Sequence, residues 1–160
     1  MFTKLFSRKA LLIWGVLFSS LFVVSVVSAD TVSGTGWLAA SGDGQVVLRG
    51  DMGTLHIKGT GTLYFKDAGE VHTPTITGAG KRIELPNGWV QYIGFNGTLH
   101  LTEADQAIVR LEGRDIQLYI EGTGDVWLRG RGHYRYNNGN TIISGTWPAA
   151  GHSIEIAPAE

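Results

Sequence analysis

The stretch GDMGTLHIKGTGTLYFKD, residues 50–67, contains the pattern that decides the fold. Each of its two glycine-containing turns precedes four or five residues in which apolar and polar side chains alternate. Alternation with a period of two is typical of a half-buried β-strand. Gly-x-Gly supplies the positive φ angles that tight turns need. The stretch therefore predicts two short strands, each introduced by a glycine turn.

The same pattern recurs at intervals of eight to nine residues through much of the chain. GRDIQLYIEGTGDVWLRG, residues 113–130, aligns with residues 50–67 when a single gap is allowed. No segment after residue 29 has a sustained 3.6-residue apolar period, so we expect essentially no helix there. We predict one all-β domain over residues 30–147, with two related halves at about 34–67 and 94–136. Residues 148–160 form a C-terminal tail, in which 153–156 are expected to add an edge strand.

Alternation also predicts which side chains form the core, because successive residues of a strand point to opposite faces. The aliphatic set is expected inside, and a mixed aromatic, histidine and basic set outside. The predicted core residues are Val46, Leu48, Leu55, Ile57, Leu63, Phe65, Leu99, Leu101, Val109, Leu111, Ile116, Leu118, Ile120, Val126 and Leu128, continued by Tyr134 and Tyr136.

Two architectures fit strands of this length and spacing. In a β-solenoid, or β-helix, short strands make one coil and the glycines stack at its corners. In an antiparallel meander closed as a barrel or sandwich, each glycine turn is a hairpin. We favour the solenoid, because neighbouring pieces present the same pattern in the same order.

The N-terminus has the three zones of a secretory signal. Basic residues at positions 4, 8 and 9 precede an uncharged apolar run over residues 10–27, and Val27-Ser28-Ala29 ends it with small residues. This order predicts a signal peptide over residues 1–29. The alternative is an uncleaved membrane anchor through residues 10–27, since a spanning helix needs about 20 residues. Either way, the domain is expected outside the cytoplasm: secreted, periplasmic or at the cell surface.

Composition narrows the partners and the chemistry. Without Lys4, Arg8 and Lys9, the basic residues fall from 13 to 10 against 14 acidic ones, a formal charge of −4 with neutral histidines. Nucleic-acid binding asks for a basic patch or stripe, so we expect no nucleic-acid partner. With no cysteine, disulfides and thiolate metal sites are excluded. Membrane contact is expected only through an uncleaved N-terminal segment.

Catalytic motifs are not found in the sequence. Gly-x-Ser-x-Gly and His-Glu-x-x-His are both missing, and the candidate aspartates lie in turns, where they are expected to bond to backbone. His56 and His100 occupy matching positions in GTLHIK and GTLHLT. They either form a paired ligand site or repeat an ancestral exposed position, and we favour the second interpretation. We therefore predict a protein that is not an enzyme and has no cofactor and no metal site.

The outward-facing aromatic and basic residues are the best functional lead. Aromatic rings can stack on sugars, while basic side chains bind carboxylates or phosphates. The alternatives are cross-strand pairing on a solvated sheet and burial of the rings under a second layer. The predicted ligand-binding residues are Tyr64, Tyr119, Trp127, His56, His100, Lys58 and Arg129.

The run VRLEGRDIQLYIEGTGDVWLRGRG, from Val109, resembles the glycine-rich β-repeat domains of bacterial adhesin-like proteins, among them the GIN head domains. Gly122-Thr123-Gly124-Asp125 stands where those domains repeat Gly-Ser-Gly-Asp, with Gly59-Thr60-Gly61-Thr62 as a weaker twin. This chain has fewer Ser-Gly pairs and more aromatic residues. The resemblance implies an exported β-helical domain of poorly defined role and assigns no functional residue.

Two functions follow as expectations. The first is a non-enzymatic structural or adhesive cell-envelope protein that acts through its β surface, including self-association at open sheet edges. The second is a module that binds an envelope glycan or an anionic polymer on the exposed aromatic and basic stripe.

Overall fold

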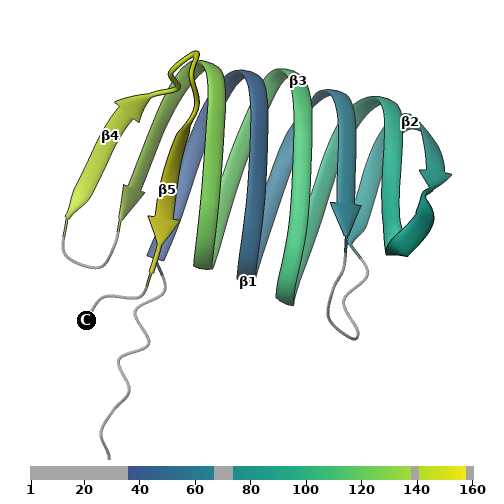
Figure 1. Ribbon diagram of the computed structural model, residues 1–160, viewed down its shortest axis with the longest axis horizontal. Coiled ribbons are helices and arrows are strands. Elements are labelled where there is room, and N and C mark those ends of the chain that lie inside the picture. Colours follow the sequence, from purple (N-terminus) through teal and green to yellow (C-terminus); the bar gives the residue numbers. More distant parts are fainter. Residues whose placement is uncertain (1–35, 67–73, 138–140, 158–160) are drawn as a thin grey trace, which may run out of the picture. The chain divides into compact units, whose positions relative to one another are not determined.

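The described part of the chain is almost entirely β-structure. The computed structural model describes residues 36–66, 74–137 and 141–157, which belong to a compact unit spanning Val32–Glu160. One antiparallel sheet contains the strands β1 (Gly36–Lys66), β2 (Thr75–Glu84), β3 (Trp89–Asn137), β4 (Ile142–Thr146) and β5 (His152–Ile156) (Figure 1). A three-residue 3₁₀ turn, η1 (Pro86–Gly88), precedes β3. The all-β prediction is confirmed, and no helix in these residues could cross a membrane.

β1 and β3 are long strands that wind side by side in opposite directions (Figure 1). Val46 of β1 pairs with both Leu111 and Leu128 of β3, which are 17 residues apart. Leu111 in turn pairs with Val46 and Leu63, also 17 residues apart. Each strand therefore returns beside itself after about 17 residues, with the other strand between. The repeats of eight to nine residues in the sequence correspond to half-turns of this winding.

This register corrects three expectations. Neighbouring strands are antiparallel, whereas the solenoid was favoured on the expectation that neighbouring pieces lie in the same order. The glycine turns within β1 and β3 are corners inside continuous strands, and so they are not hairpins. The sheet is not closed into a barrel. The physical reason is that a corner bends a strand without interrupting its hydrogen bonds to the neighbouring strands. Corners and hairpins therefore give the same sequence pattern, in which glycines separate short runs of alternating residues.

Glycine is needed at the corners because successive coils approach closely there. A β-carbon at Gly113 would collide with the carbonyl oxygen of Thr60 and lie 2.9 Å from the Cα of Gly61. Gly61 is constrained in the same way by the Glu112 carbonyl, and its φ of 145° is one that other residues rarely adopt. Gly61, Gly113, Gly44 and Gly130 follow one another in register across the sheet. These glycines, expected in turns, therefore lie where the strands bend and the coils approach most closely.

The interior of the winding is filled by the aliphatic side chains that alternation predicted. All fifteen non-tyrosine members of the predicted core except Phe65 are buried, and Phe65, Tyr134 and Tyr136 pack against the core while half-buried. No polar or charged residue is buried among the described residues. The core also contains residues that alternation did not predict, among them Leu38, Met52, Val90, Phe95, Trp147, Ile154 and Ile156.

The remaining predictions about organisation concern the ends of the chain and the repeated halves. The expected edge strand at residues 153–156 is confirmed, since β5 pairs with β3. The repeats at 50–67 and 113–130 lie mainly in β1 and β3, which interleave and do not form separate lobes. The stretch between the halves contains β2 and η1, and its residues 68–73 are not described. The predicted signal segment, residues 1–29, also lies outside the described residues.

Candidate functional site

The predicted ligand-binding residues are divided between two sides of the winding. His56 and Tyr64 flank the corner Gly59-Thr60-Gly61, where β1 passes from one side to the other. Figure 1 shows the strands crossing alternately in front and behind between such corners. Tyr64 and Trp127 therefore share one side, and the two histidines share the opposite side.

On the first side, a ladder row joins Gln91, Tyr64, Arg110, Val47 and Trp127; we call it the tyrosine row. The Tyr64 hydroxyl accepts a hydrogen bond from Gln91 Nε2 at 2.8 Å. The Arg110 guanidinium lies 5.6 Å from the centroid of the Tyr64 ring, within cation–π range. Both contacts engage Tyr64 within the protein, so cross-strand pairing accounts for its position on the sheet.

Trp127 is half-buried beneath the segment that leads into β5. A β-carbon at Gly151 would meet the Trp127 ring at 2.5–2.7 Å, so the Gly151 backbone packs directly on that ring. Arg129 holds the same segment, because its Nε donates to the Ala149 carbonyl at 3.3 Å. Part of the indole ring is thus covered by the protein's own chain. This agrees with burial of the rings, the second of the two alternatives to a binding surface.

On the opposite side, a second row joins His100, His56, Tyr119, Ala39 and Arg135; we call it the histidine row. The rings of His56 and His100 have centroids 6.3 Å apart and are tilted by 57°. Both histidines are exposed. Across the described residues, no group of three or more histidine, cysteine or acidic side chains is placed to hold a metal ion.

Lys58 lies on the same side, two residues beyond His56, and pairs with Thr98 and Gln117. The structure therefore brings together four of the seven predicted residues on this side, namely His56, His100, Tyr119 and Lys58. Tyr64, Trp127 and Arg129 lie on the other side. The single stripe expected from the sequence is two separate surfaces.

Tyr119 is 39% exposed, whereas Tyr64 and Trp127 on the opposite side are half-buried. Partial desolvation, followed by the negative charge of Glu121 and a hydrogen bond to it, raises the pKa of Tyr119. Its hydroxyl donates to Glu121 Oε2 at 3.4 Å. The phenol is therefore neutral at physiological pH, and its proton is donated to Glu121.

Replacing Glu121 with glutamine is expected to lower the pKa of Tyr119 toward that of a free tyrosine, but only in part, because desolvation is the larger cause. Because the pKa of Tyr119 is raised in the folded state, the neutral phenol contributes to the free energy of unfolding. This contribution is fully present below the pKa of the unfolded state and is lost as the pH rises through the folded-state pKa. Ultraviolet absorbance titration at alkaline pH measures the shift, with Tyr119→Phe identifying the transition. An unchanged transition in Glu121→Gln would contradict this account.

Two turn aspartates bond to neighbouring coils. Asp51 Oδ1 accepts from the backbone N–H of Gln106, and Asp43 Oδ1 accepts from that of Asp115, each at 2.9 Å. Gln106 and Asp115 both have φ of 53°, in the left-handed region. The aspartates thus stabilise strained corners of β3 from β1. The sequence correctly pointed to backbone bonding, but it placed the partner locally.

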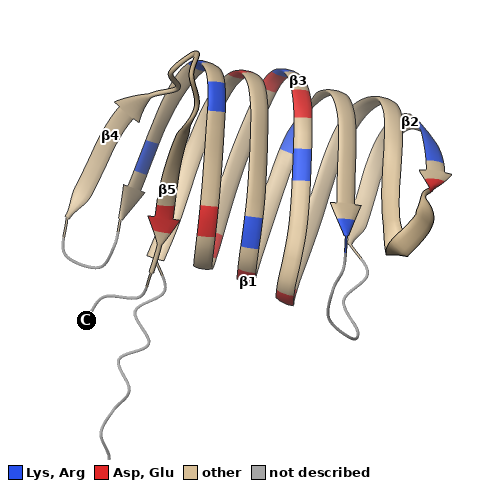
Figure 2. Cartoon of the chain, in the orientation of Figure 1, with Lys and Arg blue, Asp and Glu red and all other residues tan. Residues whose placement is uncertain are grey.

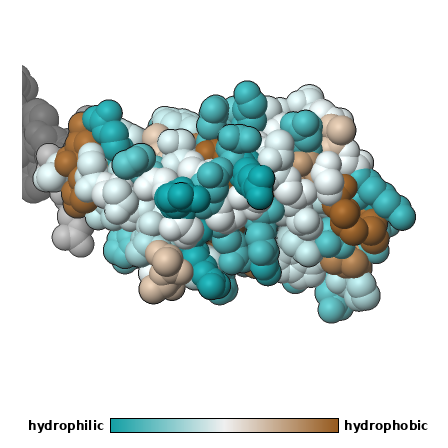
Figure 3. All heavy atoms as spheres, turned by 90° about the horizontal axis from the view of Figure 1, so that it is seen from above, coloured by the Kyte–Doolittle hydropathy of each residue, from teal (hydrophilic) through white to brown (hydrophobic). Residues whose placement is uncertain are grey.

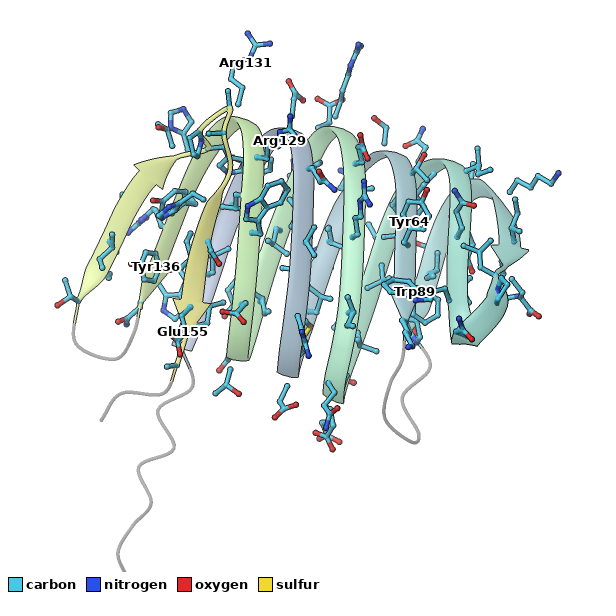
Figure 4. All side chains as sticks on the ribbon, viewed as in Figure 1. Tyr64, Trp89, Arg129, Arg131, Tyr136 and Glu155 are labelled. Atoms are coloured by element: carbon cyan, nitrogen blue, oxygen red, sulfur yellow. The ribbon has the colours of Figure 1, made fainter. Side chains whose placement is uncertain are left out.

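The structure also contains a surface groove that the sequence argument missed. A groove of about 390 Å³ lies beside the corner that contains Gly44, Gly113 and Gly130, and we call it the arginine groove. Its remaining lining residues are Gln45, Glu112, Arg114 and Arg129. Figure 2 shows basic and acidic residues interspersed over the strands and corners, so the groove is a local site without a broad field of one sign. Figure 4 shows Arg131 projecting outward near Arg129, from the same corner.

No protein-family model, no curated protein and no solved structure matches the chain. The resemblance to glycine-rich adhesin-like domains therefore stays a prediction from the sequence.

Proposed function

We propose that the chain is an exported, non-enzymatic protein of the cell envelope, with a structural or adhesive role exercised through the outer surface of an antiparallel β-solenoid. The export part rests on the order of basic, apolar and small residues over 1–29. The solenoid part is supported by the 17-residue return of both long strands and by the glycines aligned at the corners. The observation that carries the structural or adhesive role is the exposed apolar edge at β4.

β4 pairs only with β3 among the described residues, so its other edge is open to a further strand. Ile142 and Ile143 on this strand are 54% and 40% exposed. β4 contains no charged residue. Open edges of this kind are templates for pairing with another chain unless charges or bulges protect them. A second copy of the chain fits this edge, because an identical uncharged edge brings no charge repulsion.

The opposite end of the winding differs in one respect. Arg82 and Glu84 of β2 form an ion pair at 2.6 Å, with side chains 51% and 73% exposed. They pair with Tyr92 and Val90, which face the interior, so the two charges occupy inward-facing positions of an edge strand. Inward-pointing charges are a known protection against edge pairing. Although Figure 3 shows hydrophobic surface at both ends, association through β4 is thus favoured.

Sedimentation velocity of the purified chain in mild detergent is expected to show a sedimentation coefficient that rises with concentration. The substitutions Ile142→Lys and Ile143→Lys together are expected to reduce this association by about tenfold or more, because two charges must then lose their hydration at the edge. Ile93→Lys is the matched control, since Ile93 is 47% exposed but lies in β3 beside β2, at the protected end.

All variants carry the same N-terminal apolar run, so association through that run would be equal in all three proteins. A single concentration-independent species, or equal effects of the β4 and Ile93 substitutions, would remove self-association through β4 from the proposal.

A second candidate is a module that binds a glycan or an anionic polymer. The arginine groove favours it, because the groove presents two guanidinium groups beside an amide on an exposed sheet surface. The stripe predicted from the sequence supports this candidate less well, since the Trp127 ring is partly covered and the predicted residues lie on two sides.

A further inference from the structure

We infer that the arginine groove binds a carboxylated polysaccharide, with Arg114 and Arg129 contacting two carboxylates of the same polymer. The inference rests on the proposed non-enzymatic role of the outer surface and names the ligand class of one site on it. The pair of arginines and the groove are not apparent in the sequence, because the lining residues come from three separate strand segments.

The charges in the groove are unevenly satisfied. Glu112 is bonded to Arg110, with Nη2 to Oε2 at 2.8 Å, so its charge is already compensated. The Arg114 guanidinium has no partner among the described residues, and that of Arg129 makes a single long bond to the Ala149 carbonyl. The groove therefore has a surplus of positive charge and of N–H donors. Guanidinium groups bind carboxylates in a bidentate manner, which favours a planar anion.

The spacing of the arginines indicates a polymer. Gly113 precedes Arg114 and Gly130 follows Arg129, and both glycines pair with Gly44 of the strand between them. Adjacent strands are about 4.8 Å apart, so the strands that carry the two arginines are separated by about 10 Å. Two anionic groups on the same polymer suit this separation better than one small anion. The floor of aligned glycines leaves a side-chain-free path along which such a chain can lie.

Gln45 supplies the contact that favours a sugar. When its amide oxygen faces Arg110, at 2.6 Å from Nε, the NH₂ group is left to bond elsewhere. Gln45 pairs with both Glu112 and Arg129, so this amide lies between the two sides of the groove. An amide donor beside guanidinium groups can bind hydroxyl and carboxylate oxygens of the same ligand.

The groove at the other corner provides an internal comparison. It has a volume of about 250 Å³, and its lining includes Asp51, Glu103 and Asp105 but no lysine or arginine. An anionic polymer is repelled from that corner. Binding at the arginine groove thus has a defined location on a protein with a negative formal charge.

The test is binding of the full-length chain to oligogalacturonate, measured by isothermal titration calorimetry in mild detergent, with dextran as the neutral polymer. We expect binding of oligogalacturonate only, weakened by added salt and reduced about tenfold or more in Arg114→Gln/Arg129→Gln, since the variant loses its charged hydrogen bonds to the carboxylates of the ligand. Arg135→Gln is the matched control, because it removes one positive charge on the opposite side and leaves the groove unchanged. Circular dichroism checks that each variant retains its fold.

Equal binding of dextran, no binding of oligogalacturonate, or an equal loss in Arg135→Gln would overturn the inference. A dextran sulfate that binds as tightly as oligogalacturonate would overturn the preference for carboxylates. Sedimentation distinguishes failure of this inference from failure of the proposed self-association. If the chain is monomeric but binds oligogalacturonate in the groove, only self-association is contradicted. If the chain self-associates but the groove does not bind, only this inference is contradicted.

Discussion

Replacing Leu55 with alanine is expected to lower the free energy of unfolding by about 2–5 kcal/mol. Leu55 is fully buried inside the winding, where it pairs with Leu101 and Ile120 on the strands at either side. Truncation removes apolar contacts and leaves a cavity between two coils. The cavity stays open because the backbones around it are close-packed and cannot move inward. Urea unfolding followed by far-ultraviolet circular dichroism measures the loss.

His56 provides the matched control because it is the next residue of the same strand and is exposed. His56→Ala is expected to change the stability by about 0.5 kcal/mol or less, as is usual for exposed positions. If the two substitutions were equally costly, the inward and outward assignment of β1 would be wrong. The comparison therefore tests the alternation on which the fold depends.

A second large effect is expected at the corners. Gly113→Ala should destabilise the protein by about 3 kcal/mol, the upper part of the usual range for overpacking. The new methyl group would collide with the Thr60 carbonyl, which belongs to a neighbouring strand and cannot rotate away. Gly113 does not have a φ in the left-handed region, so the cost comes from the approach of the two coils and not from backbone strain.

Gly53→Ala is the control for this experiment. The nearest atom to a β-carbon at Gly53 is the Glu121 carbonyl oxygen at 3.5 Å, an ordinary van der Waals contact. We expect little change, or a slight gain of stability, because alanine reduces the conformational freedom of the unfolded chain. Thermal unfolding compares the two variants. A tolerated Gly113→Ala together with a destabilising Gly53→Ala would contradict the packing described at the corners.

The candidate site was predicted in part. Exposure of the histidines and of Tyr119 followed from local alternation, as did the burial of their neighbours. Their association did not follow, because His56 lies beside Tyr119, 63 residues later, and on the opposite side from Tyr64, eight residues later. The covering of Trp127 by the segment around Gly151 is likewise a contact between distant parts of the chain.

The arginine groove had one detectable signal in the sequence. Gly44, Gly113 and Gly130 each occupy a turn of the repeated pieces, and stacking these pieces in one order would align them. Nothing in the repeated pattern, however, identifies which antiparallel strand lies beside each piece. For that reason, the predicted binding residues do not include Arg114, and they group Arg129 with four residues of the opposite side, namely His56, His100, Tyr119 and Lys58.

The sequence by itself determined the all-β class, the spacing of the glycine corners and the division of side chains between interior and surface. These features depend on the period-two geometry of a strand and on the conformational freedom of glycine, which act over a few residues. Only the tertiary structure decided that the strands are antiparallel and wind past each other, and which outer residues meet. Those relations depend on backbone hydrogen bonds between residues far apart in the chain, and the alternating pattern is the same whichever strand lies alongside.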